Sequence, residues 1–407
     1  MPSRRRLLGG VAAAGATLTG AGWLGRLGPV ETRSPDSDAW PLERRDATNS
    51  ASTDALAPED PSVDWEREAL GGRGFPTLVV DRDTVYVGEN RVATLDRSDG
   101  SLLWDADVPG DALALSDGAL YAASGRTAPD ADAPALRAFG AADGTERWSR
   151  SLPSPAYGLL ATADGLFVGC HGSLVGVGPG GGDRWRLDAP GSGAVYPMVH
   201  DGSLYAGHPG YVRRYGRRRL LDVPLGSGPD PVWEGGEVSG SRPPTVVAGN
   251  LIMGSDQAPV DCGDPAVHAF DLEDGERAWD TVPGPTESEV GVTALTPARV
   301  GDVGATAVVR REDGERTSRV LGLDLDDGAT LRREPLDAVP RAVAGSRNVF
   351  LVAGGGDPSV TDGYVRAYDQ DGNDRWDVDF DAGVTAVAPV EGAVFVALED
   401  GRVVRLA

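Results

Sequence analysis

A short unit recurs along residues 63–407, and it constrains the fold more than any other feature of the chain. Its clearest copy is Thr94-Leu95-Asp96, a small residue, a spacer and an aspartate, followed by Gly100 and then Trp104. Runs of alternating apolar residues, separated by Gly and Asp-Gly turns, surround each copy and are typical of β-strands. Tryptophan returns at the same place in six copies: Trp65, Trp104, Trp148, Trp185, Trp279 and Trp376. We therefore expect an all-β fold.

The spacing of the copies predicts an eight-bladed β-propeller of four-stranded antiparallel blades. Residues 75–407 number 333, and one eighth of that length is about 42, within the range of a propeller blade. A linear β-solenoid and a seven-bladed ring with one misassigned copy are the alternatives. Each copy is expected to supply four strands, A to D, with the tryptophan on strand D.

The last copy lacks its fourth strand. Residues 401–406 continue as strand C and the chain then stops, whereas residues 63–70 hold Trp65 in an alternating run. We expect this N-terminal strand to complete the last blade, because closure removes the exposed edges of the sheet. The domain is accordingly placed at residues 63–407.

The residues of the unit have architectural roles. The aspartate that ends strand C can accept hydrogen bonds from the amides of the following turn, and the glycine provides the positive φ that the turn requires. The indole is large and flat enough to fill the space between neighbouring blades, with its N–H donating to a group there. The repeat therefore indicates a fold and not an activity.

Composition excludes several classes of function. All 38 basic residues are arginine, against 62 acidic residues, and the net charge is −24. Such a charge opposes binding to nucleic acid or to an anionic membrane. Two cysteines cannot form a disulfide framework.

The N-terminus predicts export. Arg4, Arg5 and Arg6 are followed by two leucines and a weakly apolar Gly/Ala-rich stretch, so residues 1–30 resemble a twin-arginine signal. An uncleaved membrane anchor is the alternative. Residues 31–62 are an acidic arm rich in Pro, Ser and Asp, with no periodicity. We expect an extracellular or cell-surface protein.

The excess of acid suits a chain that folds in concentrated salt. In molar salt the Debye length falls to about 3 Å, which screens repulsion among surface carboxylates. A GC-rich coding bias also favours Arg over Lys. Together these features predict the exported protein of a halophile, most simply an archaeon.

The unit resembles the propeller repeat of the PQQ-like family, which includes the pyrroloquinoline quinone (PQQ) dehydrogenases and the non-enzymatic assembly factor BamB. The arm adds to the likeness, because Trp40-Pro41, Asp46 and Asn49 are similar to a lead-in common in prokaryotic members. The resemblance implies the fold directly. It implies function weakly, because the repeat residues hold blades together.

The enzymes of this family hold PQQ with a calcium ion and, in many members, beside a ring of two adjacent disulfide-bonded cysteines. Here Cys170 and Cys262 are 92 positions apart, so no such ring can form. A disulfide between them, and a metal site of Cys170, His171 and His208, stay open but have no diagnostic spacing. Asp369-x-Asp371-x-Asn373 departs from a calcium loop and is interpreted as a blade turn.

Long connections are expected on one face of the ring, and loops on a rigid scaffold commonly carry binding residues. The B–C connections 124–134, 254–265, 309–318 and 354–363 and the D–A connection 222–242 all belong to that face. Its candidate contact residues are His171, His208, Trp233, Glu234, Arg242 and Asp261.

The sequence favours a non-catalytic exported propeller that acts as a binding or protein-interaction scaffold at the cell surface. No catalytic residue, metal site or cofactor is assigned. The expected partner is another protein or a small ligand on the long-loop face; the chain is expected to be a monomer, with membrane contact only through an uncleaved N-terminus. The alternative is a PQQ-dependent quinoprotein oxidoreductase that uses PQQ and calcium to act on an alcohol or sugar.

Overall fold

The computed structural model describes residues 34–407 except 73, 126–133, 190, 217–225, 237, 239–241, 256–265, 282–289, 313–314 and 356–361. The proposed export signal and Asp261 lie outside the described residues. Within the described part, no helix has the length and apolar character needed to cross a bilayer.

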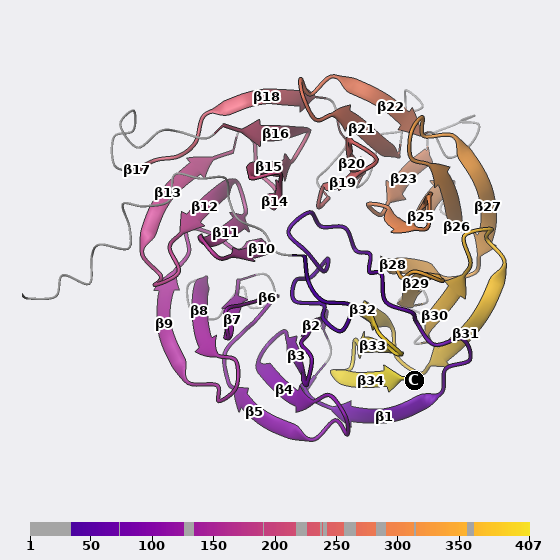
Figure 1. Cartoon of the computed structure of the whole chain (residues 1–407), viewed down its shortest axis with the longest axis horizontal. Helices are drawn as coiled ribbons and strands as arrows, with labels where there is room; N and C mark the ends of the chain where they lie inside the picture. Colours follow the sequence, from indigo (N-terminus) through magenta and orange to yellow (C-terminus); the bar gives the residue numbers. More distant parts are fainter. Residues whose placement is uncertain are drawn as a thin grey trace, which may run out of the picture.

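Eight β-sheets surround a single axis, each with its first strand innermost (Figure 1). Blades 1 to 4 are formed, in the order A to D, by the following strands. Blade 1 holds β2 (Thr77–Val80), β3 (Thr84–Gly88), β4 (Val92–Asp96) and β5 (Leu102–Ala106). Blade 2 holds β6 (Ala112–Ser116), β7 (Ala119–Ala123), β8 (Ala135–Gly140) and β9 (Glu146–Ser151). Blade 3 holds β10 (Ala156–Thr162), β11 (Gly165–Cys170), β12 (Ser173–Val177) and β13 (Asp183–Asp188). Blade 4 holds β14 (Tyr196–His200), β15 (Ser203–His208), β16 (Tyr211–Tyr215) and β18 (Pro231–Gly236).

Blades 5 to 8 follow the same order. Blade 5 holds β19 (Thr245–Val247), β20 (Asn250–Gly254), β21 (Val267–Asp271) and β22 (Arg277–Thr281). Blade 6 holds β23 (Val290–Ala294), β25 (Val303–Glu312), β26 (Glu315–Asp324) and β27 (Thr330–Leu336), with β24 (Ala298–Val300) pairing β25. Blade 7 holds β28 (Val339–Gly345), β29 (Phe350–Gly355), β30 (Gly363–Tyr368) and β31 (Asp374–Phe380). Blade 8 holds β32 (Val384–Val390), β33 (Ala393–Leu398), β34 (Arg402–Leu406) and β1 (Val63–Glu68).

The N-terminal strand closes the ring as the sequence predicts. Strand β1 pairs antiparallel with β34, with Trp65 opposite Arg405. Ion pairs across this seam join Arg402 to Glu66, at 2.7 Å, and Arg405 to Asp64. The prediction of eight blades is confirmed, and the seven-bladed ring and the solenoid are wrong.

All six predicted tryptophans lie on strand D of their blades, and Trp65, Trp104, Trp148 and Trp279 contact the C–D turn of the next blade. Trp65, Trp104 and Trp148 donate their indole N–H to the carbonyls of Arg97, Ala141 and Pro179, in the C–D turn of the following blade. The turn glycine lies directly under the ring: a Cβ on Gly144 (φ +69°) would come within 2.7 Å of Trp104. Glycine is therefore required both by the backbone and by the indole.

The aspartate that ends strand C also has its predicted role. Asp96 accepts a hydrogen bond from the amide of Ser98 at 2.8 Å, and Asp271 accepts one from the amide of Glu273 at 2.6 Å. Asp369 accepts the amides of Asp371 and Asn373 at 2.9 Å, so this segment is a blade turn.

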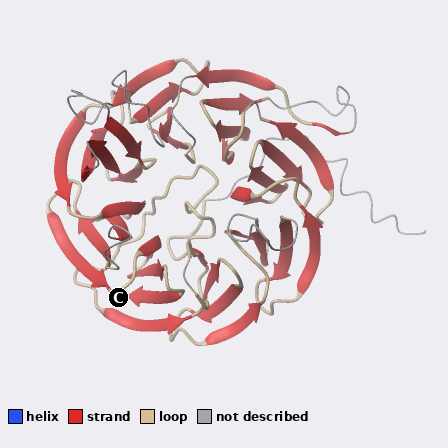
Figure 2. Cartoon of the chain, turned by 180° about the vertical axis from the view of Figure 1, so that it is seen from behind, coloured by secondary structure: helices blue, strands red, loops and turns tan. Residues whose placement is uncertain are grey.

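The arm is built into the propeller, which its composition did not indicate. Residues 34–62 run through the middle of the ring, as both views show (Figures 1 and 2). Trp40 pairs with Val80 of blade 1 and Leu42 with Ala114 of blade 2, while Ser52 pairs with Gly345 of blade 7. Further backbone hydrogen bonds join the arm to blades 4 and 8, through Val199 and Gly392.

Two of the predicted connections are strands instead. Of the predicted connection 309–318, residues 309–312 belong to β25 and residues 315–318 to β26, and Val309 pairs with Ser318. The segment 222–242, expected as a D–A loop, contains β18 together with β17 (Gly226–Ser227), which pairs parallel with β13 of blade 3. The long insertion in blade 4 therefore precedes strand D and lies in its C–D connection.

Candidate binding cleft between blades 4 and 5

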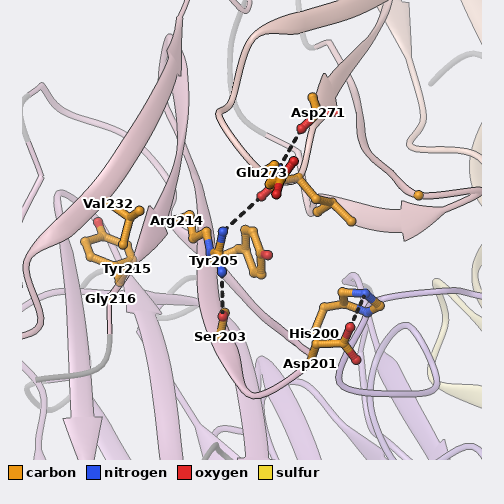
Figure 3. A pocket seen from close by; sticks show the side chains of 12 residues that line it. His200, Asp201, Ser203, Tyr205, Arg214, Tyr215, Gly216, Val232, Asp271 and Glu273 are labelled. Carbon is orange, nitrogen blue, oxygen red and sulfur yellow. Dashed lines mark hydrogen bonds and ion pairs between the residues drawn. The ribbon is translucent and has the colours of Figure 1, made fainter.

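A cleft of about 550 Å³ lies between blades 4 and 5. It opens at the end of the ring where the A–B and C–D turns lie, opposite to the predicted long-loop face. Blade 4 contributes the turn at His200 and Asp201 and the ends of strands B and C, and blade 5 contributes its C–D turn (Figure 3). The residues that concern its chemistry are His200, Asp201, Ser203, Tyr205, Arg214, Tyr215, Asp271 and Glu273.

Arg214 is the fixed cation of the cleft. It follows Arg213 on β16, and the alternation of the strand turns the two side chains to opposite faces. The Arg214 Nη1 donates to the carbonyl of Leu272 at 3.2 Å, and Nη2 donates to Ser203 Oγ at 3.4 Å. The guanidinium also lies 5.9 Å from the ring centre of Tyr205. Arg214 therefore joins the two blades at the base of the cleft.

The Ser, His and Asp residues of the cleft are not arranged as a nucleophile with its base. The contact of Ser203 Oγ is with Arg214, whereas the His200 Nε2 lies 3.5 Å from the neighbouring Asp201. Triad catalysis requires a hydrogen bond from the hydroxyl to the imidazole. Ser203 and His200 do not form that pair here.

The rim of the cleft is acidic and its inner wall is aromatic. Asp201, Asp271 and Glu273 are exposed, while Tyr205 and Tyr215 are buried beneath them. Asp271 is held in place by the turn amides of Glu273 and Asp274. An acidic rim over an apolar wall complements a basic or amphipathic segment.

His208, a predicted contact residue, is a packing residue. Its side chain is 1% exposed, stacks on Tyr211 at 4.6 Å and makes a 2.8 Å hydrogen bond from Nε2 to the hydroxyl of Tyr215. Burial, together with the charge of Arg213, lowers the pKa of His208 to about 3. The imidazole is therefore neutral and is not an accessible contact.

Trp233 and Glu234 were assigned to a D–A connection, and that placement is wrong. Both lie on β18, the D strand of blade 4. Trp233 donates to the carbonyl of Leu272 at 3.1 Å and covers Gly275, so it is a seventh repeat tryptophan. Glu234 pairs with Arg213 at 2.6 Å across the blade.

His171 and Arg242 occupy connections, as predicted. His171 is exposed in the B–C turn of blade 3, beside Tyr157. Arg242 leads into blade 5, and its charge adds to the desolvation that lowers the pKa of Arg44 of the arm to about 10. A function for the long-loop face stays a prediction.

The described residues do not assemble the metal site that was left open. Cys170 is a buried free cysteine on β11, and burial raises the pKa of its thiol to about 12. Cys262 lies outside the described residues. In the described ranges, no three His, Cys, Asp or Glu side chains come together in a geometry that could hold a metal.

The family model for the outer membrane protein assembly factor BamB matches residues 51–281 and, in a second overlapping register, residues 171–361. The two matches together span most of the ring, and the overlap is expected when a model built on repeats aligns at two positions. The chain belongs to the BamB-type family of PQQ-like propellers. No curated protein matches this member of the family in sequence.

Solved structures share the fold of this BamB-type propeller at low identity. BamB from Moraxella catarrhalis aligns with a TM-score of 0.61 and 16% identity, covering 85% of this chain and 97% of that one. The quinohemoprotein alcohol dehydrogenase ADHIIG from Pseudomonas putida HK5 aligns with a TM-score of 0.62 and 12% identity, covering 91% and 80%. A europium-containing methanol dehydrogenase aligns at 0.62 and 11%, covering 90% of each chain. At these identities the likeness establishes the fold alone.

Proposed function

We propose that this chain is an exported, non-catalytic propeller that binds a partner protein in the cleft between blades 4 and 5. The observation that carries the proposal is the cleft itself, an open cavity whose polar side chains are held in contacts between strands and blades, with carboxylates exposed at its rim. The family likeness to BamB, which its name describes as an assembly factor, supports a role in protein association. A basic segment of the partner would contact Asp271 and Glu273.

The arm gives independent support for a scaffold. The polar residues of its lead-in fix the fold of the arm or hold the arm to the blades. Asp46 accepts hydrogen bonds from Thr48 and Ser50, and the Asn49 amide donates to the carbonyl of Pro197 at 3.1 Å. Arg44 donates from Nη2 to the carbonyls of Thr296 and Pro297, both at 3.1 Å.

A PQQ-dependent oxidoreductase acting on an alcohol or sugar is the second candidate, favoured by the structural likeness to quinoprotein dehydrogenases. The residues present do not fit the cofactor well. The paired-cysteine ring has no counterpart, because Cys170 is packed inside β11 and its only possible partner is 92 positions away. We derive no reaction step through PQQ.

Export and adaptation to salt remain part of the proposal. The arginine cluster at residues 4–6 supports a twin-arginine route, which carries folded proteins. The net charge of −24 supports function in concentrated salt, where surface repulsion is screened. A cell-surface or extracellular location, in a halophilic archaeon, follows from both.

Two single charge-reversal variants test which face of the ring binds the partner. Immobilised chain is incubated with envelope proteins of the producing organism in molar salt, and retained proteins are quantified by mass spectrometry. Glu273→Arg should reduce the retained partner by at least about tenfold, because it reverses a rim charge. Glu315→Arg makes the same change on the hairpin of blade 6, at the opposite end of the ring, and should retain the partner. Loss with Glu315→Arg alone would place the partner on the long-loop face and refute the cleft.

A further inference from the structure

Blade 6 differs from the seven other blades at the position that packs against its neighbour. Strand D carries a tryptophan in every other described blade, whereas β27 carries the exposed Arg332. Arg332 holds the tryptophan register: it pairs with Gly322, as Trp104 pairs with Thr94. Its Cδ lies over Gly372 of blade 7, where a Cβ would come within 2.7 Å. The aliphatic stem of Arg332 therefore covers the glycine, but no ring fills the space beside it.

Strand B of blade 6 also has a small residue where most other blades have an aromatic ring, which enlarges the space beside Arg332. In blades 1 to 4 and 8, strand B places an aromatic ring about 6 Å from the tryptophan of the same blade: Tyr86, Tyr121, Phe167, Tyr205 and Phe395. In blade 6 this position is Ala305, which pairs with Gly322 as Tyr86 pairs with Thr94. Blade 6 thus lacks both rings that fill the equivalent junction elsewhere.

The result is a cavity of about 200 Å³ between blades 6 and 7. Val300, Ala305 and Val320 of blade 6 form one wall, and Phe350 and Tyr368 of blade 7 form the other. All five side chains are buried, with exposed fractions between 2% and 7%. Tyr368 of blade 7 holds the same repeat position as Phe139 of blade 2. The ring centre of Phe139 lies 6.1 Å from that of Trp104. The wall that receives an indole at another junction is therefore present here.

The rim also has the polar groups that a ring N–H requires. In the repeat, an aspartate or its equivalent ends strand C. At three other junctions the indole N–H donates to the backbone carbonyl of the next residue along the chain: Arg97, Ala141 and Leu272. Gln370 follows Asp369 at this place in blade 7 and lines the cavity. The guanidinium of Arg332 lies at the same opening, where it can cover the face of an electron-rich ring.

We infer that this cavity is a binding site for a flat aromatic ring of indole size that carries a ring N–H. Apolar cavities enclosed by protein bind small aromatic molecules of matching shape. The ring would occupy the cavity beside Arg332, which already covers Gly372, donate to the Gln370 carbonyl and lie against the guanidinium of Arg332. The site is separate from the cleft between blades 4 and 5, and the inference does not depend on the proposed function.

Isothermal titration calorimetry of the full chain with indole, which measures affinity and stoichiometry, tests the inference. Wild type should bind one indole per chain, and Arg332→Trp should weaken that affinity by at least about tenfold, because its own indole fills the cavity. Ala305→Leu, which fills the inner part of the cavity, should weaken it in the same direction. Arg333→Trp adds a tryptophan at the adjacent exposed position and should bind indole as the wild type does.

N-acetyltryptophanamide distinguishes the source of the ring. Binding of this probe and of indole, both lost in Arg332→Trp, indicates a tryptophan side chain of a polypeptide. Binding of indole alone, lost in the same variant, indicates a free small aromatic compound. Absence of saturable indole binding to the wild type, or equal binding by Arg332→Trp, would overturn the inference.

Discussion

Replacing Trp233 with alanine is expected to lower the free energy of unfolding by about 3–5 kcal/mol, the usual cost of removing a buried indole. The side chain is 8% exposed, packs 5.9 Å from Tyr205 and donates to the Leu272 carbonyl of blade 5. Its ring lies over Gly275, where a Cβ would come within 2.4 Å. The loss leaves a cavity at a blade junction and removes one of the two side-chain hydrogen bonds to the Leu272 carbonyl, the other being that of Arg214.

Urea unfolding of Trp233→Ala, with the midpoint and slope fitted in the same salt as wild type, measures the effect. Val232→Ala is the matched control: it lies next on β18, is 57% exposed and should change stability by no more than about 0.5 kcal/mol. A cost below about 1 kcal/mol for Trp233→Ala would mean that the residue is a surface contact, as its sequence context suggested.

Replacing Trp40 with alanine should have a similar cost, about 3–5 kcal/mol, because the arm is part of the folded core. Trp40 is 2% exposed, and its backbone exchanges hydrogen bonds with Val80 at 2.7 and 2.8 Å. It belongs to the apolar cluster that also contains Trp65 and Leu78. Removing the indole therefore loosens both the arm and blades 8 and 1.

The same unfolding experiment on Leu56→Ala provides the control for the arm. Leu56 is 39% exposed, and its truncation should cost less than about 1 kcal/mol. A cost below about 1 kcal/mol for Trp40→Ala as well would contradict the claim that the Trp40 indole is part of the folded core.

The parts of the fold that the sequence predicted are those specified by local spacing. Each copy carries its own turn glycine and strand-D tryptophan, so Trp104 and Gly144 locate a blade junction without any long-range information. The closing strand was predictable because the last copy ends at strand C. Trp233 was missed since the insertion between Gly216 and Asp230 moves strand D away from its expected distance after strand C.

Features that depend on contacts distant in sequence were not predictable. The arm has no periodicity, and its place is set by hydrogen bonds such as that of Val199 with Ala47. His208 is the last residue of β15, next to a turn, so its sequence context predicts exposure. It is buried because Tyr211 and Tyr215 pack against it. The cleft arises where blade 4 meets blade 5.

The central claim is that this propeller is a binding scaffold and not a quinoprotein enzyme. Calorimetric titration of the full chain with PQQ in molar salt, with and without Ca²⁺, tests it most directly, with a quinoprotein alcohol dehydrogenase apoenzyme as positive control. We predict no saturable heat under either condition. Saturable, calcium-dependent binding at one site per chain would contradict the claim and favour an oxidoreductase.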